Sequence, residues 1–196
     1  MSKVSRRAAL KALGTTAALL PVLSQSGLAA FAQIQSGNAA PAPKVLSTAD
    51  FQTLEVLVEA IIPTDERSPG AKDARVADYI DLLLSENDEE IALQWIGGLA
   101  ALNQEAMSRF GGRFERLDAA NADAIMADIS KNELNPDTPL SQFFVMTKQA
   151  TIRGYYSSEI GIHRELRYKG NQFLQEFVGC ATEDGTDCPH CGQKHQ

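Results

Sequence analysis

The sequence contains few of the side chains that most often carry out catalysis, with three histidines and three cysteines among 196 residues. Two histidines and all three cysteines lie at or after Cys180, so His163 is the sole histidine in the body of the chain. A lone histidine is more often a surface or hydrogen-bonded residue than a general base, which must be oriented toward its substrate. This scarcity predicts that the chain has no catalytic centre of its own.

The motifs that build common catalytic and cofactor sites are also missing. The chain has no glycine-rich dinucleotide or phosphate-binding loop, no H-E-x-x-H zinc motif and no G-x-S-x-G nucleophile turn. It also lacks the E-x-x-H pairs with which four-helix bundles hold metals. We therefore expect that this chain has no catalytic residue and no cofactor site and is not an enzyme by itself.

Basic side chains are outnumbered by acidic ones, 18 against 25, and the formal net charge is −7. The first 32 residues hold four of the basic side chains and no acidic one, so the remainder carries 14 against 25 and a net charge of −11. A domain this acidic repels phosphate backbones, which disfavours nucleic-acid binding.

Long hydrophobic runs are absent too, and the apolar stretch near the N-terminus, residues 12–23, is short. It follows the basic segment Ser5-Arg6-Arg7-Ala8-Ala9-Leu10-Lys11 and precedes Ala30-Phe31-Ala32. This order is typical of a secretory signal peptide, here residues 1–32 with cleavage after Ala32. The pair formed by Arg6 and Arg7 indicates the twin-arginine translocon.

The same stretch is unsuited to spanning a membrane, which takes roughly 20 consecutive apolar residues. Ser24-Gln25-Ser26 interrupts it, and no cysteine follows that could carry a lipid anchor. We expect a periplasmic protein that is soluble or peripherally associated with the membrane. An uncleaved signal acting as a weak tether is the alternative.

About 160 residues follow the signal peptide, which is enough for one domain with a hydrophobic core. Residues 33–46 are rich in Gln, Ala, Pro, Ser and Gly and lack periodicity, which predicts a flexible linker. Residues 47–179 are expected to form the domain, and residues 180–196 an irregular tail rich in cysteine and histidine.

Apolar side chains recur at helical spacing along the domain, beginning after the helix cap expected at Ser47. Helices are expected from Ser47 to Pro63, from near Asp73 through Leu84, from Asp88 to Phe110, from Asp118 to Leu134 and from Leu140 to Tyr156. Residues 160–178 have a mixed pattern, and no segment alternates with the period of a strand. The prediction is an all-α fold, a single compact helical domain of about five to six helices.

Potential ligand side chains gather in the tail, at Cys180, Cys188, His190 and Cys191, with His195 beyond them. Haem attachment through C-x-x-C-H is excluded because Gly192 follows Cys191. The Cys-Pro-His-Cys run resembles a thiol oxidoreductase site without its βαβ setting, and its ligands suit zinc. A disulfide in an oxidising periplasm, an irregular tail, a zinc site and redox or intersubunit bonding stay open. The alternative function is therefore a stand-alone metal-binding or thiol-active periplasmic protein.

Aromatic side chains are concentrated on the last expected helix, at Phe143, Phe144, Tyr155 and Tyr156. Small residues on one side of the same helix would let another backbone approach closely. The aromatic side chains either pack the core of the domain or anchor a partner protein, for which aromatics are favoured.

Three stretches of the sequence together resemble a known protein family. The first runs from Phe51 to Asp81 and contains Ile61-Ile62-Pro63 and Ser68-Pro69-Gly70-Ala71. The second is Phe143-Phe144 followed by Thr151-Ile152-Arg153-Gly154-Tyr155-Tyr156-Ser157, and the third is Tyr168-Lys169-Gly170-Asn171. Over about residues 47–180 they resemble the gluconate 2-dehydrogenase subunit 3 family, the small subunits of flavin-dependent sugar and sugar-acid dehydrogenases.

The resemblance implies a division of labour. A separate large subunit, of the glucose–methanol–choline oxidoreductase type, would bind FAD and oxidise the sugar or sugar acid, and a cytochrome c or another acceptor would take the electrons. The small subunit would bind and stabilise the large one and lend it the twin-arginine signal, so that the flavoprotein crosses the membrane folded. The family pattern brings no catalytic residue to this chain and does not include the tail.

On this basis the expected site is a partner interface. It comprises a turn and the end of the last helix, namely Ile61, Ile62, Pro63, Pro69, Gly70, Phe143, Phe144, Arg153, Tyr155 and Tyr156. Proline and glycine would fix the path of the turn, and the aromatic side chains would bury apolar area worth roughly 25 cal/mol per Å².

Overall fold

The computed structural model describes residues 22–37, 42–168 and 170, which contain helices and no strand. The α-helices are α2 (Gln25–Ser36), α3 (Thr48–Ile61), α4 (Val76–Ser85), α5 (Glu89–Phe110), α6 (Ala119–Ser130) and α7 (Pro139–Tyr156). A 3-10 helix, η1 (Phe114–Arg116), and a π-helix, η2 (Ile160–Glu165), complete the described part. The predicted all-α fold is confirmed. Among the described residues no helix is long and apolar enough to cross a membrane.

Three helices begin at capping side chains. The side chains of Ser47, Asp118 and Thr138 each accept a hydrogen bond from the backbone amide three residues further on, at 3.1, 2.8 and 3.1 Å. These bonds satisfy amides that have no partner inside the helix. The first, fourth and fifth expected helices therefore start within about one residue of their predicted positions.

Helix α6 ends earlier than expected, at Ser130 instead of Leu134. Beyond it, the amides of Lys131 and Glu133 bond to carbonyls only three residues back, which is turn geometry. Leu134 is fully exposed, so no packing holds a further helical turn in place. The prediction extended the helix to the break expected at Asn135-Pro136, but the sequence does not reveal where tertiary packing stops supporting a helix.

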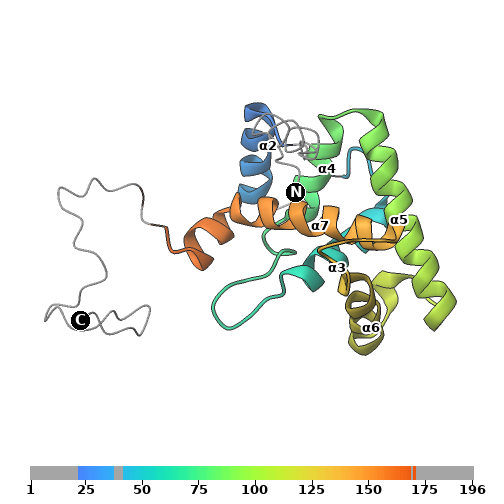
Figure 1. Ribbon diagram of the computed structural model, residues 1–196. Coiled ribbons are helices and arrows are strands. Elements are labelled where there is room, and N and C mark those ends of the chain that lie inside the picture. Colours follow the sequence, from blue (N-terminus) through green and yellow to red (C-terminus); the bar gives the residue numbers. More distant parts are fainter. Residues whose placement is uncertain (1–21, 38–41, 169, 171–196) are drawn as a thin grey trace, which may run out of the picture.

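Helix α4 lies at the centre of the domain. Every residue from Val76 to Leu84 is buried, and the helix packs against α2, α3, α5 and α7. Figure 1 shows α7 crossing the middle of the molecule, with α2 near one end and α5 and α6 near the other. A helix that is covered all round is stabilised almost entirely by its neighbours.

Helices α5 and α7 cross at a point where a glycine removes the side chain between them. The ring of Trp95 meets the ring of Phe143 edge-on, with centroids 5.6 Å apart. A Cβ atom on Gly98 would lie 2.1 Å from Phe143 Cδ2, whereas one on the adjacent Gly97 would meet nothing within 4 Å. Gly98 is therefore needed for the close approach of the two helices.

These two glycines provide a matched pair of substitutions in one helix. Gly98→Ala is expected to lower the free energy of unfolding by about 2 kcal/mol, because the added methyl group displaces Phe143 from a packed core. Gly97→Ala is expected to raise it by about 0.5–1 kcal/mol through helix propensity alone. Urea unfolding followed by circular dichroism measures both changes, and equal effects of the two substitutions would contradict the packing.

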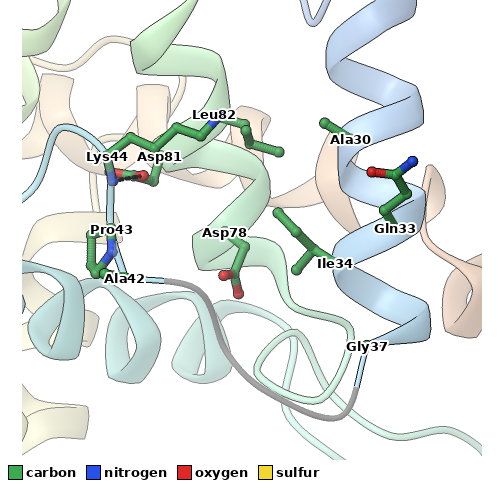
Figure 2. Close-up of a pocket in the computed structure, with 10 residues that line it drawn as sticks. All are labelled: Ala30, Gln33, Ile34, Gly37, Ala42, Pro43, Lys44, Asp78, Asp81 and Leu82. Carbon is green, nitrogen blue, oxygen red and sulfur yellow. Dashed lines mark hydrogen bonds between the residues drawn. The ribbon is translucent and has the colours of Figure 1, made fainter.

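Two parts of the segment expected to be a linker are held by the rest of the domain. Residues 33–36 form the end of α2. Residues 44–46 are held by α4, because the Asp81 carboxylate accepts hydrogen bonds from the amides of Lys44, Val45 and Leu46 at 2.6, 3.1 and 3.0 Å. Figure 2 shows the bond from Lys44. Asp81 is only 4% exposed, and these amides provide the hydrogen bonds that a buried carboxylate needs.

Candidate functional site

A folded loop between α3 and α4 carries much of the expected interface. The amide of Ala71 donates to the carbonyl of Ile62 at 2.9 Å and closes the two ends of the loop. Inside it, the Glu59 carboxylate accepts from the amides of Thr64 and Lys72 at 2.9 and 2.8 Å. These contacts give the loop a defined shape instead of the freedom of an ordinary surface turn.

Gly70 is required where the loop passes Glu59. A Cβ atom at this position would lie 2.4 Å from the Glu59 carboxylate and 2.6 Å from the amide nitrogen of Thr64. The Gly70 amide itself donates to the hydroxyl of Thr64 at 2.8 Å. The predicted role of this glycine in fixing the path of the turn thus has a clear packing reason.

The tip of the loop is organised by Asp65. Its carboxylate accepts hydrogen bonds from the amides of Arg67 and Ser68 at 2.7 and 2.9 Å. These backbone bonds hold the pKa of Asp65 below its usual value, because they favour the charged form. The carboxylate is exposed and negatively charged at neutral pH.

Tyr155, near the end of α7, fastens this loop to the helix. Its hydroxyl donates to the carbonyl of Pro69 at 2.8 Å and forms a second hydrogen bond with the hydroxyl of Ser68, also at 2.8 Å. Burial raises the pKa of Tyr155, which is 2% exposed, and the phenol stays neutral near pH 7. These hydrogen bonds join the loop after α3 to α7, two segments that are far apart in the sequence.

A cleft of about 220 Å³ lies where the loop, the end of α3, the end of α7 and η2 meet. Its lining is partly apolar and has two acidic side chains; it comprises Ile61, Ile62, Pro63, Asp65, Ser68, Tyr155, Tyr156 and Glu165. The ring of Tyr156 stands edge-on to that of Tyr155 at 5.4 Å and is 40% exposed. The lining pairs no nucleophile with a base, and it suits recognition of a side chain better than chemistry.

A hollow of about 320 Å³ between α2 and α4 is a weaker candidate, although its lining includes two buried carboxylates (Figure 2). Asp81 is occupied by three amides, as described above. Asp78 forms an ion pair with Arg75 at 2.7 Å. Both carboxylates therefore stabilise the fold, and neither is left to bind a ligand.

The structure brings most of the expected interface residues together. Ile61, Ile62, Pro63, Tyr155 and Tyr156 line the cleft. Pro69 and Gly70 lie in the loop behind it, where Pro69 bonds to Tyr155. Sequence spacing placed these residues in two separate groups, and tertiary packing unites them.

Three expected interface residues lie elsewhere. Phe143 and Phe144 are each 5% exposed and pack in the core, and Phe143 also lines a groove between α5 and α7. Their large apolar area is buried where α7 meets its neighbours, which corresponds to the core alternative. Arg153 is half-buried; its positive charge opposes the rise that burial causes in the pKa of Tyr79 on α4.

Three lining residues were not predicted: Asp65, Ser68 and Glu165. The Asp-x-x-Ser spacing before Pro69 is a turn signal that could have indicated the first two. Glu165 lies in the segment whose pattern was mixed, and only the irregular π-helix places it at the cleft. His163, on the same π-helix, is exposed.

The cysteine and histidine cluster of the tail, at Cys180, Cys188, His190 and Cys191, lies outside the described residues, as do Arg6 and Arg7. Within the described ranges no group of three or more His, Cys, Asp or Glu side chains could hold a metal ion. A zinc site in the tail and the signal function of the arginines therefore stay predictions.

Comparison with known proteins gives one result. A family model, gluconate 2-dehydrogenase subunit 3, matches residues 48–173, which is more than half of the chain. No protein of curated function and no solved structure matches. The matched residues extend from the start of α3 past η2 and include the whole cleft. The chain therefore belongs to the gluconate 2-dehydrogenase subunit 3 family.

Proposed function

We propose that this protein is the non-catalytic small subunit of a periplasmic gluconate or sugar dehydrogenase. In this role it binds and stabilises the FAD-containing catalytic subunit, and its twin-arginine signal carries that folded subunit across the membrane. Membership of the subunit 3 family supports a place in a dehydrogenase complex. A flavin bound before export would require a route that carries folded proteins, which the arginine pair indicates.

The observation that carries the proposal is the cleft at the end of α7. The matched family segment contains a hydrogen-bonded loop that lines a partly apolar cleft, and the exposed Tyr156 is part of the same lining. Tyrosine is a frequent anchor of protein interfaces because its ring is large and rigid and its hydroxyl can form hydrogen bonds. A surface organised in this way fits the binding of another protein.

The charges of the cleft indicate which kind of partner side chain it would bind. Asp65 and Glu165 are the acidic side chains of its lining, and Ile62 and Tyr156 supply apolar contact. An arginine or lysine of the catalytic subunit would place its charge between the carboxylates and its aliphatic stem against the apolar side chains. We therefore assign this cleft to a basic side chain on the large subunit.

Co-purification with an FAD-containing dehydrogenase subunit from the same organism tests the proposal. The wild-type protein is expected to retain the flavoprotein and its FAD absorbance on an affinity column. Tyr156→Ala is expected to weaken the complex by about 2 kcal/mol, roughly 30-fold in Kd, because it removes an exposed anchor from the cleft. Titration of the two purified subunits measures this change.

The matched control is Leu134→Ala, which truncates an even more exposed side chain in the turn after α6. It should leave the Kd unchanged, and thermal unfolding should show that both variants are folded. Equal binding by wild type and Tyr156→Ala would show that the cleft is not part of the interface. Failure of the wild type to retain any flavoprotein would refute the subunit role itself.

A further inference from the structure

Helix α2 is an integral part of the domain, although it contains the last residues of the predicted signal peptide. Phe31 is 1% exposed and Leu23, just before the helix, is 5% exposed. The ring of Phe31 meets that of Tyr79 on α4 edge-on, with centroids 5.3 Å apart and an angle of 71°. The helix is thus anchored to the central helix of the fold by a large buried side chain.

The start of α2 is tied to the end of α4. The Glu86 carboxylate accepts hydrogen bonds from the amide and the hydroxyl of Ser24, both at 2.9 Å. Gly27 is buried against the same carboxylate, which a Cβ atom would approach to 2.6 Å. A glycine at this position allows the two helices to come together.

The end of α2 is tied to two other segments by Gln35. Its side-chain amide donates to the carbonyl of Ala74 at 3.3 Å and accepts from the amide of Glu159, after α7, at 3.1 Å. Helix α2 is therefore held at its start, its middle and its end. The bond between Ala32 and Gln33 lies inside this helix, between Phe31 and Gln35.

Peptidases cleave segments that are exposed and can open locally. We propose that the folded domain protects the bond after Ala32 from leader peptidase, so that α2 stays in the exported protein. This replaces the cleavage after Ala32 that the sequence alone predicts; it rests on the export step of the proposed function, but not on the partner subunit or the cleft. Cleavage there would separate Leu23 and Phe31 from the core that they help to fill.

The first test is the intact mass and N-terminal sequence of the chain recovered from the periplasm. The proposal expects every exported molecule to contain Gln25 to Ala32. A chain that begins at Gln33, or anywhere inside α2, would overturn it.

The second test compares cleavage of the purified full chain and of a synthetic peptide of residues 1–40, which contains the whole predicted signal, by purified leader peptidase. The peptide is expected to be cut after Ala32, and the folded chain about a hundredfold more slowly, since cleavage follows the fraction of open molecules. Equal rates would overturn the proposal, and so would a peptide that is not cut, because the fold would then have no site to protect.

Two variants loosen α2 without altering the recognition motif. Phe31→Ala keeps alanine at both ends of Ala30-Phe31-Ala32, and Glu86→Ala leaves the leader sequence untouched. Both should speed cleavage of the full chain, Phe31→Ala by about tenfold or more. Leu28→Ala, at a position 41% exposed, is the control and should not change the rate. If neither variant is cut faster than wild type, the docking of α2 does not protect the bond after Ala32, and the proposal is wrong.

Discussion

Replacing Asp81 with alanine is expected to lower the free energy of unfolding by about 3 kcal/mol, because it leaves three backbone amides without their acceptor. The amides of residues 44–46 all donate to this carboxylate, and that of Leu46 is buried. An unsatisfied buried donor costs about 1–3 kcal/mol. The substitution would also release the segment that leads into α3.

Urea unfolding of Asp81→Ala and Asp81→Asn measures this effect. Asparagine keeps the size of the side chain and one acceptor oxygen, so its expected loss is smaller, about 1–2 kcal/mol. Asp123→Ala, on the exposed face of α6, is a control for removal of one negative charge and should change stability by less than about 0.5 kcal/mol. A loss below that level for Asp81→Ala would contradict the role of the carboxylate.

Replacing both Arg6 and Arg7 with lysine is expected to keep this chain and its flavoprotein partner in the cytoplasm. The translocon reads the arginine pair itself, and lysine preserves the charge while removing the planar guanidinium groups. Periplasmic dehydrogenase activity should fall to background while total cellular activity remains. Fractionation followed by an activity assay and immunoblotting measures both outcomes.

Lys11→Arg, a change of similar size outside the pair, is the control and should leave export intact. If the flavoprotein still reaches the periplasm when both arginines are replaced, the small subunit is not its export carrier. The binding experiment on the cleft would stand regardless, so the two parts of the proposed function can fail separately.

Local signals predicted the helical part of this fold well. Ser47, Asp118 and Thr138 cap the helices that follow them, and Gly111 ends α5 with a φ of 73°, which favours glycine. These features act over a few residues, so a single sequence contains them in full. The family resemblance, based on the turn after α3 and the end of α7, is confirmed by the matching family model.

Features that depend on distant partners were not predictable in the same way. Phe31 is buried because Tyr79 lies beside it, and the sequence around Phe31 has the ordinary composition of a signal peptide. Asp81 lies on a helix whose apolar residues alone were expected to face the core. The cleft exists because Tyr155 reaches Pro69, and the spacing of neither residue reveals that contact.

The hydrogen bond between Gln35 and Glu159 has a consequence for protein synthesis. Its two residues are 124 positions apart, so the site that receives the end of α2 is incomplete until nearly all of the domain has been translated. At about 5–20 residues per second, the ribosome needs roughly 6 to 25 seconds to cover that distance. During this interval α2 cannot complete its docking. Complete docking of α2 therefore requires that nearly all of the domain has already been synthesised.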